Sequence, residues 1–420
     1  MQDFDLILFD LDDCLLRTGD LARFRGKENV GVSTVEYKES LLAAANGGDR
    51  TMISGATIES ICESHDAPRI GVFTTSPRCY AETLLGHYYP DVNWDVIVAF
   101  EDVQHTKPFA DGINRARAEL GIQDFRRVVV IGDSWKDIYS AYRAGCWAVL
   151  FRACWPPSRA DWDGQRYKAV NQLPDAIADS PEELNTVLEW PHRHLPLLEK
   201  YSAFGGDPPP GSPSRTQPIN HFNNHNEDRS FVPVLTLGRL FSDYQELAPR
   251  RNWHQLTAEI HAHKDADDFP PAWVAAVREA MKEILPGRLL FGRTRAVIAV
   301  IPAKPGRTPR MEIFLGQLQA YLNANPWSDR IDLTYAPQLL VYGNGALSHH
   351  GAHLGSKERF DNVRDNLQVA TPDIALRRHV VVIDDVVTSG ATMFYANEYL
   401  RQAGASDVSC LALAQAVSLG

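Results

Sequence analysis

Residues 379–392 read HVVVIDDVVTSGAT, and this stretch decides the fold of the second half of the chain. The apolar run that ends at Ile383 predicts a buried parallel strand. A small turn rich in hydroxyl groups and glycine follows, and the next segment, MFYANEYLRQAG, reads as an amphipathic helix. A strand, a loop and a helix in this order are typical of an α/β fold.

The turn at 388–392 has the chemistry of an anion site. Backbone N–H groups at a helix start, together with the helix dipole, favour negative charge, and phosphate is the natural guest. The acidic pair before it, Asp384 and Asp385, is suited to the two hydroxyls of a ribose and is expected in the same loop. An ordinary helix cap is the alternative, but a cap does not need two acids directly before the turn.

The same string resembles the phosphoribosyl pyrophosphate (PRPP) motif of type I phosphoribosyltransferases. That motif is an apolar strand, two acidic residues, then Thr, a small residue, Gly, any residue and Thr, and all of it is present here. The resemblance implies PRPP contacts from Asp384, Asp385, Thr388, Ser389, Gly390, Ala391 and Thr392.

Composition describes a globular protein with more than one core. The chain has 420 residues, 44% hydrophobic and 23% charged, whereas a single core stops growing near about 250 to 300 residues. The net charge of −11 argues against broad nucleic-acid binding. No apolar run approaches the roughly 20 residues that span a bilayer, so a membrane partner is not expected. The acidic N-terminus and six cysteines without CxxC spacing predict a cytoplasmic protein with reduced thiols.

The first strand of the chain delivers a pair of carboxylates. Residues 4–9, FDLILF, are a short apolar run that ends at Asp10, and Asp12 lies two residues further on. Ligands bind at the carboxyl edge of an open α/β sheet, where one acid can attack phosphorus and the other can transfer a proton. A lone DxD pattern also occurs in caps and turns, so the later segments decide its meaning.

Three later segments make the acidic pair specific. Residues 69–77, RIGVFTTSP, predict a strand that ends in hydroxyl groups able to hold a phosphoryl oxygen. Lys107 can neutralise a transferring phosphoryl group. The segment VVVIGDSWKD then supplies Asp133 and Asp137 for an oxygen-rich Mg²⁺ site.

Together these segments resemble the haloacid dehalogenase superfamily, in which four such motifs occur in this order. The resemblance implies a nucleophile at Asp10, which forms an aspartyl-phosphate, and a general acid/base at Asp12. It also implies that Thr74 binds phosphate and that Lys107 is the lysine of the third motif. The implied Mg²⁺ ligands are Asp10, Asp12, Asp133 and Asp137.

The segment between the first two motifs, at about residues 15–68, reads as two short helices that Ser33 and Ser54 cap. In this superfamily such an insert is a cap over the active site that sets substrate choice, and a packing elaboration is the alternative. The chain departs from the superfamily just before the insert, where Asp13 and Cys14 replace the usual Gly and then Thr or Val.

Residues 201–230 are rich in Pro, Gly, Ser and Asn and predict a linker. His221 and His225 have the spacing of a helical metal pair, but helical propensity is poor there. We therefore expect two doubly wound parallel-sheet domains, a dehalogenase-like one at 1–200 and a phosphoribosyltransferase at 231–420.

The order of elements in the second half is similar to the ComF-like branch of phosphoribosyltransferases. There, a strand ends in a proline-containing loop, and a later segment carries Arg and Asn three residues apart. The branch's usual Arg-Gly-Phe-Asn-Gln is replaced here by Arg310 and the residues beyond it. A solvated basic loop is the alternative to a phosphate contact. The candidate pyrophosphate contacts are Lys304, Arg307, Arg359 and Asn362.

The two resemblances predict a bifunctional enzyme of nucleotide metabolism that uses Mg²⁺ at both sites. The second domain would transfer ribose 5-phosphate from PRPP to a base, and the first would remove a phosphate, such as the 5-phosphate of that product. The alternative is a PRPP or nucleotide sensor, or a toxin-like effector, held by a partner macromolecule in a bacterial stress or phage-defence system. The base, the phosphatase substrate and the oligomeric state stay open.

Overall fold

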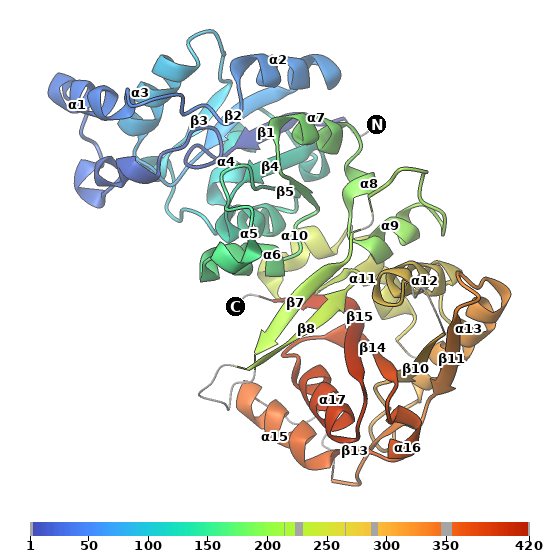
Figure 1. The fold of residues 1–420 in the computed structure, drawn as a ribbon. Helices are drawn as coiled ribbons and strands as arrows, with labels where there is room; N and C mark the ends of the chain where they lie inside the picture. Colours follow the sequence, from blue (N-terminus) through green and yellow to red (C-terminus); the bar gives the residue numbers. More distant parts are fainter. Residues whose placement is uncertain are drawn as a thin grey trace. The chain divides into compact units, whose positions relative to one another are not determined.

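The computed structural model divides the chain into two compact units (Figure 1). The first unit consists of Met1–Leu195 and Asp243–Trp253, and the second of Pro196–Ser242 and His254–Gly420. The residues that the structure describes are 3–213, 215–222, 230–264, 266–286, 293–345 and 355–418. Each unit contains its own sheet with helices, so the predicted α/β class with two sheets is confirmed.

The first unit contains a parallel six-stranded sheet with the order β3-β2-β1-β4-β5-β6. The chain adds β2 and β3 on one side of β1, and then β4, β5 and β6 on the other side. The carboxyl ends of β1 and β4 therefore form the topological switch point, where open α/β sheets bind ligands. The strands are β1 Leu6–Phe9, β2 Arg69–Phe73, β3 Val96–Val98, β4 Val128–Gly132, β5 Trp147–Phe151 and β6 Ala176–Ala178.

Helices and short 3₁₀ segments complete the first unit. The α-helices are α1 Val35–Ala45, α2 Gly55–Ser64, α3 Arg78–Tyr88, α4 Asp111–Glu119, α5 Trp135–Ala144, α6 Gly164–Asn171, α7 Pro181–Glu189, α8 Pro191–His194 and α10 Ala248–Arg251. The insert holds α1, α2 and the 3₁₀ segments η1 Gly19–Phe24 and η2 Lys27–Asn29.

Of the two predicted helix caps in the insert, Ser54 is confirmed and Ser33 is wrong. Ser54 accepts a hydrogen bond from Thr57 N and caps α2, as predicted. Helix α1 is capped by Thr34 and not by Ser33, since Thr34 Oγ1 accepts from Tyr37 N at 3.2 Å. Helix α1 starts one residue later than the sequence pattern indicated. The side-chain oxygen that caps it therefore comes from Thr34, the residue directly before the helix.

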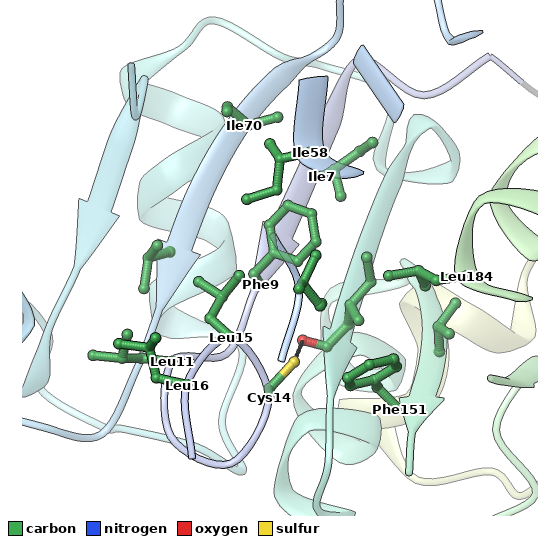
Figure 2. Close-up of a cluster of buried hydrophobic side chains, with 14 of the residues drawn as sticks. Ile7, Phe9, Leu11, Cys14, Leu15, Leu16, Ile58, Ile70, Phe151 and Leu184 are labelled. Carbon is green, nitrogen blue, oxygen red and sulfur yellow. Dashed lines mark hydrogen bonds between the residues drawn. The ribbon is translucent and has the colours of Figure 1, made fainter. Parts of the chain in front are cut away.

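The unusual Asp13–Cys14 pair fits the turn after β1. Asp13 has a φ of 57°, in the left-handed region that Asp tolerates better than most side chains, and its Oδ1 accepts from Thr18 N. Cys14 is fully buried in the core cluster of Figure 2, where its Sγ donates to Ile131 O at 3.6 Å. Burial raises the pKa of the Cys14 thiol. Asp13 thus adopts the backbone conformation that glycine usually provides, and Cys14 adds a side chain to the hydrophobic core.

A segment from the second half of the sequence packs into the first unit. Asp243–Trp253, with the 3₁₀ segment η6 Gln245–Leu247 and helix α10, leaves the second unit and returns to it. Its Arg250 is 1% exposed and forms an ion pair with the fully buried Asp175. Arg250 also donates to Cys146 O, and its guanidinium lies 3.8 Å from the ring centroid of Trp253. The predicted domain limits placed this whole segment in the second domain.

Replacing Arg250 with Met is expected to lower the free energy of unfolding of the first unit by about 3–5 kcal/mol. The change leaves the Asp175 carboxylate buried without its charge partner. Urea denaturation followed by tryptophan fluorescence checks this value. The matched control is Arg251→Met, because Arg251 is more exposed and its pair with Asp243 costs less than about 1 kcal/mol to lose. Equal losses of unfolding free energy in the two variants would contradict a stabilising role of the Arg250–Asp175 ion pair.

The second unit contains a seven-stranded sheet with the order β11-β10-β14-β15-β8-β7, and β9 also pairs with β15. The β7–β8 pair is antiparallel and the other pairs are parallel. The order reverses between β10 and β14, which form this sheet's switch point. The strands are β7 Gln217–Phe222, β8 Phe231–Thr236, β9 Arg239–Phe241, β10 Thr294–Val300, β11 Ile331–Ala336, β14 His379–Val387 and β15 Asp407–Val417.

Both faces of this second sheet are covered. Ile298 and Val300 of β10 belong to one hydrophobic core, and Val297 and Ala299 belong to another, as expected for a buried parallel strand. A separate antiparallel pair consists of β12 Leu340–Tyr342 and β13 Leu367–Val369. The helices are α9 Leu197–Ala203, α11 Gln255–Ala262, α12 Pro271–Ile284, α13 Arg310–Ala324, α15 Ser356–Asn366, α16 Pro372–Ala375 and α17 Ala391–Gln402.

The predicted linker contains a strand. Ile219 and His221 alternate toward the interior along β7, which pairs with β8. This alternation was hidden by the polar and proline-rich composition of the stretch. His221 is therefore on a strand and not on a helix, and His225 lies outside the described residues. Within the described ranges, no helix is long and apolar enough to cross a membrane.

Candidate active site of the first unit and ligand cavity of the second

Two buried acids, one half-buried acid and a buried lysine meet at the switch point of the first sheet. Asp10 follows β1, Asp133 follows β4, and Asp137 lies in the first turn of α5. Lys107 Nζ lies 2.6 Å from Asp10 Oδ1 and 2.6 Å from Asp137 Oδ1. One carboxylate oxygen from each of the three acids lies within 4.8 Å of the others. Strand order thus brings together residues that are far apart in the sequence.

The negative charge of this cluster exceeds the charge of its one lysine, which favours binding of a cation. Burial raises the pKa of Asp10 to about 7, although Lys107 opposes the shift, and burial also raises the pKa of Asp133. Burial alone would lower the pKa of Lys107, but Asp10 and Asp137 raise it above its usual value. One ammonium cannot neutralise three carboxylates. The oxygen-only donor set and the excess negative charge fit Mg²⁺.

Asp12 is not part of this cluster, although the sequence analysis included it among the metal ligands. Its carboxylate instead accepts hydrogen bonds from hydroxyl groups. Thr18 Oγ1 donates to Oδ1 at 2.7 Å and Tyr80 OH at 2.9 Å, while Ser76 Oγ donates to Oδ2. The predicted phosphate-binding Thr74 lies here too, with its Oγ1 3.4 Å from Asp12 Oδ2. The Asp12 carboxylate thus lies apart from the three clustered carboxylates, and its role as a metal ligand stays a prediction.

Arg25 is a residue of this site that the sequence analysis missed. It follows η1 in the insert, and its Nη1 lies 3.1 Å from Asp12 Oδ1. Thr18, Ser76 and Tyr80 were not assigned a role either. The hydroxyl-rich end of β2 pointed toward Ser76, whereas no periodic pattern marks Thr18, Arg25 or Tyr80 as neighbours of Asp12.

A cavity of about 220 Å³ lies at the carboxyl ends of β10 and β14 in the second unit. Tyr342 was not predicted for it. Among the residues that the structure describes, Arg307, Arg359 and Asn362 are not part of its lining, and Lys304 is the candidate pyrophosphate contact that lines it together with the motif. The cavity is lined by Ile301, Pro302, Lys304, Tyr342, Asp384, Asp385, Val386, Val387, Thr388, Ser389, Gly390, Ala391, Thr392 and Met393.

The acidic pair of this cavity is half-buried and lies in a strand rather than in a loop. Asp384 pairs with Ala412 of β15, because β14 continues to Val387. Burial raises the pKa of Asp384 well above its usual value, and the neighbouring Asp385 raises it further. Arg310 Nη1 donates to Asp385 Oδ2 at 3.0 Å. The pair therefore has one cationic partner in place.

Lys304 and Tyr342 add one cationic and one aromatic side chain to the wall of the cavity. Burial lowers the pKa of Lys304, while Asp384 opposes that shift. The Lys304 Nζ lies 5.7 Å from the centroid of the Tyr342 ring, and burial raises the pKa of Tyr342 to about 12. The ammonium group of Lys304 and the two carboxylates place charges of both signs in one small cavity.

The loop before α17 has no room for a side chain at Gly390. This residue has a φ of 77°, and a Cβ placed on it would lie 2.3 Å from Cβ of His221. His221 is 7% exposed and comes from β7, within the predicted linker. Strand β7, which the sequence analysis took for a linker, thus packs against the turn of the predicted PRPP motif.

A larger cavity of about 370 Å³ lies beside β11. Its lining includes Trp327, Leu333 and Tyr335 and no charged side chain. Its described lining offers no cation for a phosphate and no acidic pair, so the smaller cavity at the switch point is the candidate ligand site.

Comparison with known proteins concerns the first unit. Residues 56–151 match the family model of haloacid dehalogenase-like hydrolases. A search of curated proteins finds no match.

Several solved structures are similar over the amino-terminal part of the chain. A CbbY mutant from Rhodobacter sphaeroides in complex with xylulose-(1,5)bisphosphate is 21% identical, with 43% of this chain and 96% of that chain covered and a TM-score of 0.32. A predicted phosphoglycolate phosphatase from Haemophilus somnus is 18% identical, with coverage of 44% and 99% and a TM-score of 0.30. The putative hydrolase YfnB from Bacillus subtilis, bound to magnesium, is 16% identical, with coverage of 44% and 99% and a TM-score of 0.30. The family match lies within the first unit, which thus contains a haloacid dehalogenase-like hydrolase domain, and the match does not reach the second unit.

Proposed function

We propose that the first unit hydrolyses phosphate monoesters with Mg²⁺ and that the second unit binds PRPP. The observation that carries the first half is the position of Lys107, 2.6 Å from both Asp10 and Asp137, beside a third acid. This arrangement offers a nucleophile, a counter-charge for a phosphoryl group and a metal site in one place.

In the proposed hydrolysis, Asp10 attacks phosphorus and forms an aspartyl-phosphate while the ester bond breaks. Asp12 gives a proton to the leaving oxygen and later takes one from the water that cleaves the intermediate. Lys107 offsets the charge on the phosphoryl oxygens, and Thr74 holds one of them. Asp10, Asp133 and Asp137 would hold Mg²⁺, which supplies further charge neutralisation when bound.

In the second unit, Asp384 and Asp385 would hold the ribose hydroxyls of PRPP, and the turn from Thr388 to Thr392 would hold its 5-phosphate. Lys304 would contact the pyrophosphate. The supporting observation is that one cavity is lined by all of these residues. Transfer of the phosphoribosyl group to a base, followed by removal of the 5-phosphate in the first unit, would make the chain a coupled two-step enzyme.

One observation favours the alternative, a PRPP or nucleotide sensor or a toxin-like effector. Arg307, Arg359 and Asn362 do not line the cavity, and Arg310 already pairs with Asp385. A site in which few of the described residues can contact pyrophosphate can bind PRPP without turning it over. Such a protein would act with a partner macromolecule, as in a bacterial stress or phage-defence system.

Incubation with Mg²⁺, PRPP and a mixed pool of bases and nucleotides, followed by mass spectrometry, distinguishes these functions. The coupled enzyme is expected to form a new nucleoside, and the Asp10→Asn variant is expected to accumulate the nucleotide instead. PRPP binding without pyrophosphate release would favour the sensor. Phosphate release from every nucleotide tested, with no base incorporated, would refute the coupling.

A further inference from the structure

Strands β10 and β14 part at the cavity of the second unit. Their shared register ends at the pair Val300 and Ile383. Beyond this pair β14 continues along β15, where Asp384 pairs with Ala412, whereas the chain after β10 enters the loop that carries Lys304. The ammonium group and the acidic pair therefore stand on two backbone segments that are no longer in register with each other.

The first turn of α13 contacts both of these segments. Arg310 Nη1 donates a hydrogen bond to Asp385 Oδ2 at 3.0 Å. In the same turn, Glu312 Oε1 accepts a hydrogen bond at 3.1 Å from the backbone N–H of Ala303, the residue directly before Lys304. One helical turn thus ties the segment that carries the acids to the segment that carries the ammonium group.

These two side chains also keep buried polar atoms without a partner. Within the described part of the chain, Nε and Nη2 of Arg310 and Oε2 of Glu312 are buried and make no hydrogen bond. Such atoms have lost their solvating water, which lowers stability, and apolar residues at the same positions would avoid this cost. Proteins break local rules of this kind at functional sites, so a structural role alone does not explain the polar pair.

We infer that Arg310 and Glu312 are positioning residues of the cavity, Arg310 for the acidic pair and Glu312 for Lys304. This inference rests on the proposed PRPP site. Asp385 Oδ1 accepts from Val386 N at 2.7 Å and Oδ2 from Arg310, which fixes the carboxylate through both oxygens. Each oxygen keeps a second lone-pair site for a ribose hydroxyl. Glu312 fixes the start of the loop and thereby the place where Lys304 meets pyrophosphate.

Two ligands that each carry one end of PRPP separate the two roles. Calorimetry in Mg²⁺ compares ribose 5-phosphate, which has the ribose hydroxyls, with inorganic pyrophosphate. Arg310→Met is expected to weaken ribose 5-phosphate and PRPP at least about tenfold, the effect of about one hydrogen bond, and to leave pyrophosphate within about twofold. Glu312→Leu is expected to weaken pyrophosphate and PRPP by a similar factor and to leave ribose 5-phosphate unchanged.

The second variant excludes a simple charge effect. Loss of the Glu312 carboxylate removes negative charge near an anion, which by itself would tighten pyrophosphate binding. Arg310→Lys and Glu312→Gln keep a donor and an acceptor, and we expect the same crossed pattern with smaller factors. These conservative variants decide the result if a truncated variant does not fold. Gln319→Met, at an exposed position of α13, is the matched control and should change no affinity.

The outcomes separate the inference from the PRPP site on which it rests. Crossed losses in the two variants would support the inference. Equal weakening of both fragments by either variant, or no weakening in a wild-type protein that binds all three ligands, would overturn the inference and leave the PRPP site in place. A wild-type protein that binds none of the three ligands would refute the site and the inference together.

Discussion

Phosphate release from p-nitrophenyl phosphate is expected to fall at least about a thousandfold in the Asp10→Asn variant. The amide cannot form the aspartyl-phosphate, so the step that splits one difficult displacement into two is lost. The variant also removes one of the three acids around the metal position. We therefore expect the rise in melting temperature that Mg²⁺ causes in the wild type to shrink in the variant.

The matched control for this change is Asp5→Asn, which alters a carboxylate just before the start of β1. Asp5 forms an exposed ion pair with Arg127, so hydrolysis should stay within about twofold of the wild type. Acid-quenched wild-type protein is expected to carry phosphate on the peptide that contains Asp10. Wild-type rates in Asp10→Asn would show that the chemistry does not pass through this residue.

Gly390→Ala is expected to weaken PRPP binding about thirtyfold or more. The added Cβ would lie 2.3 Å from Cβ of His221, and alanine at a φ of 77° is strained. Overpacking of about 1–3 kcal/mol and left-handed strain of about 1–2 kcal/mol both act on the turn that would hold the 5-phosphate. Titration calorimetry with PRPP and Mg²⁺ measures the change.

The control for the glycine substitution is Gly316→Ala in α13. No atom lies within 4 Å of a Cβ placed there, so PRPP affinity should not change and stability should rise by about 0.5–1 kcal/mol. Phosphate-ester hydrolysis by the first unit should be normal in both variants. Unchanged PRPP affinity in Gly390→Ala would show that this turn does not hold the ligand.

Features that one stretch of sequence determines were predictable. The apolar runs of β1, β4 and β14 are buried parallel strands, and the acids that follow β1 and β4 meet because strand order places those two strands side by side. The turn chemistry before α17 also follows from local residues. Motifs at strand ends are informative since the geometry of a parallel sheet gathers those ends at one edge.

Features that depend on distant partners were not predictable. Strand β7 exists through its pairing with β8, and polar composition hid its alternation. Arg25 reaches Asp12 through the path of the insert, which no periodicity describes. The position of the Asp12 carboxylate apart from the three clustered acids likewise depends on donors from the insert and from α3. Each of these results from tertiary contacts that a local pattern does not contain.

The segment Asp243–Trp253 belongs to the first unit, although the residues before and after it belong to the second. The chain passes between them at Leu195–Pro196, Ser242–Asp243 and Trp253–His254, so no single cut of the backbone separates them. A fragment that begins at residue 231 would carry Arg250 without Asp175, and a fragment that ends at residue 230 would keep Asp175 without Arg250. The two units are therefore expected to be inherited together, because gene fission between them would separate the buried Arg250 from the buried Asp175.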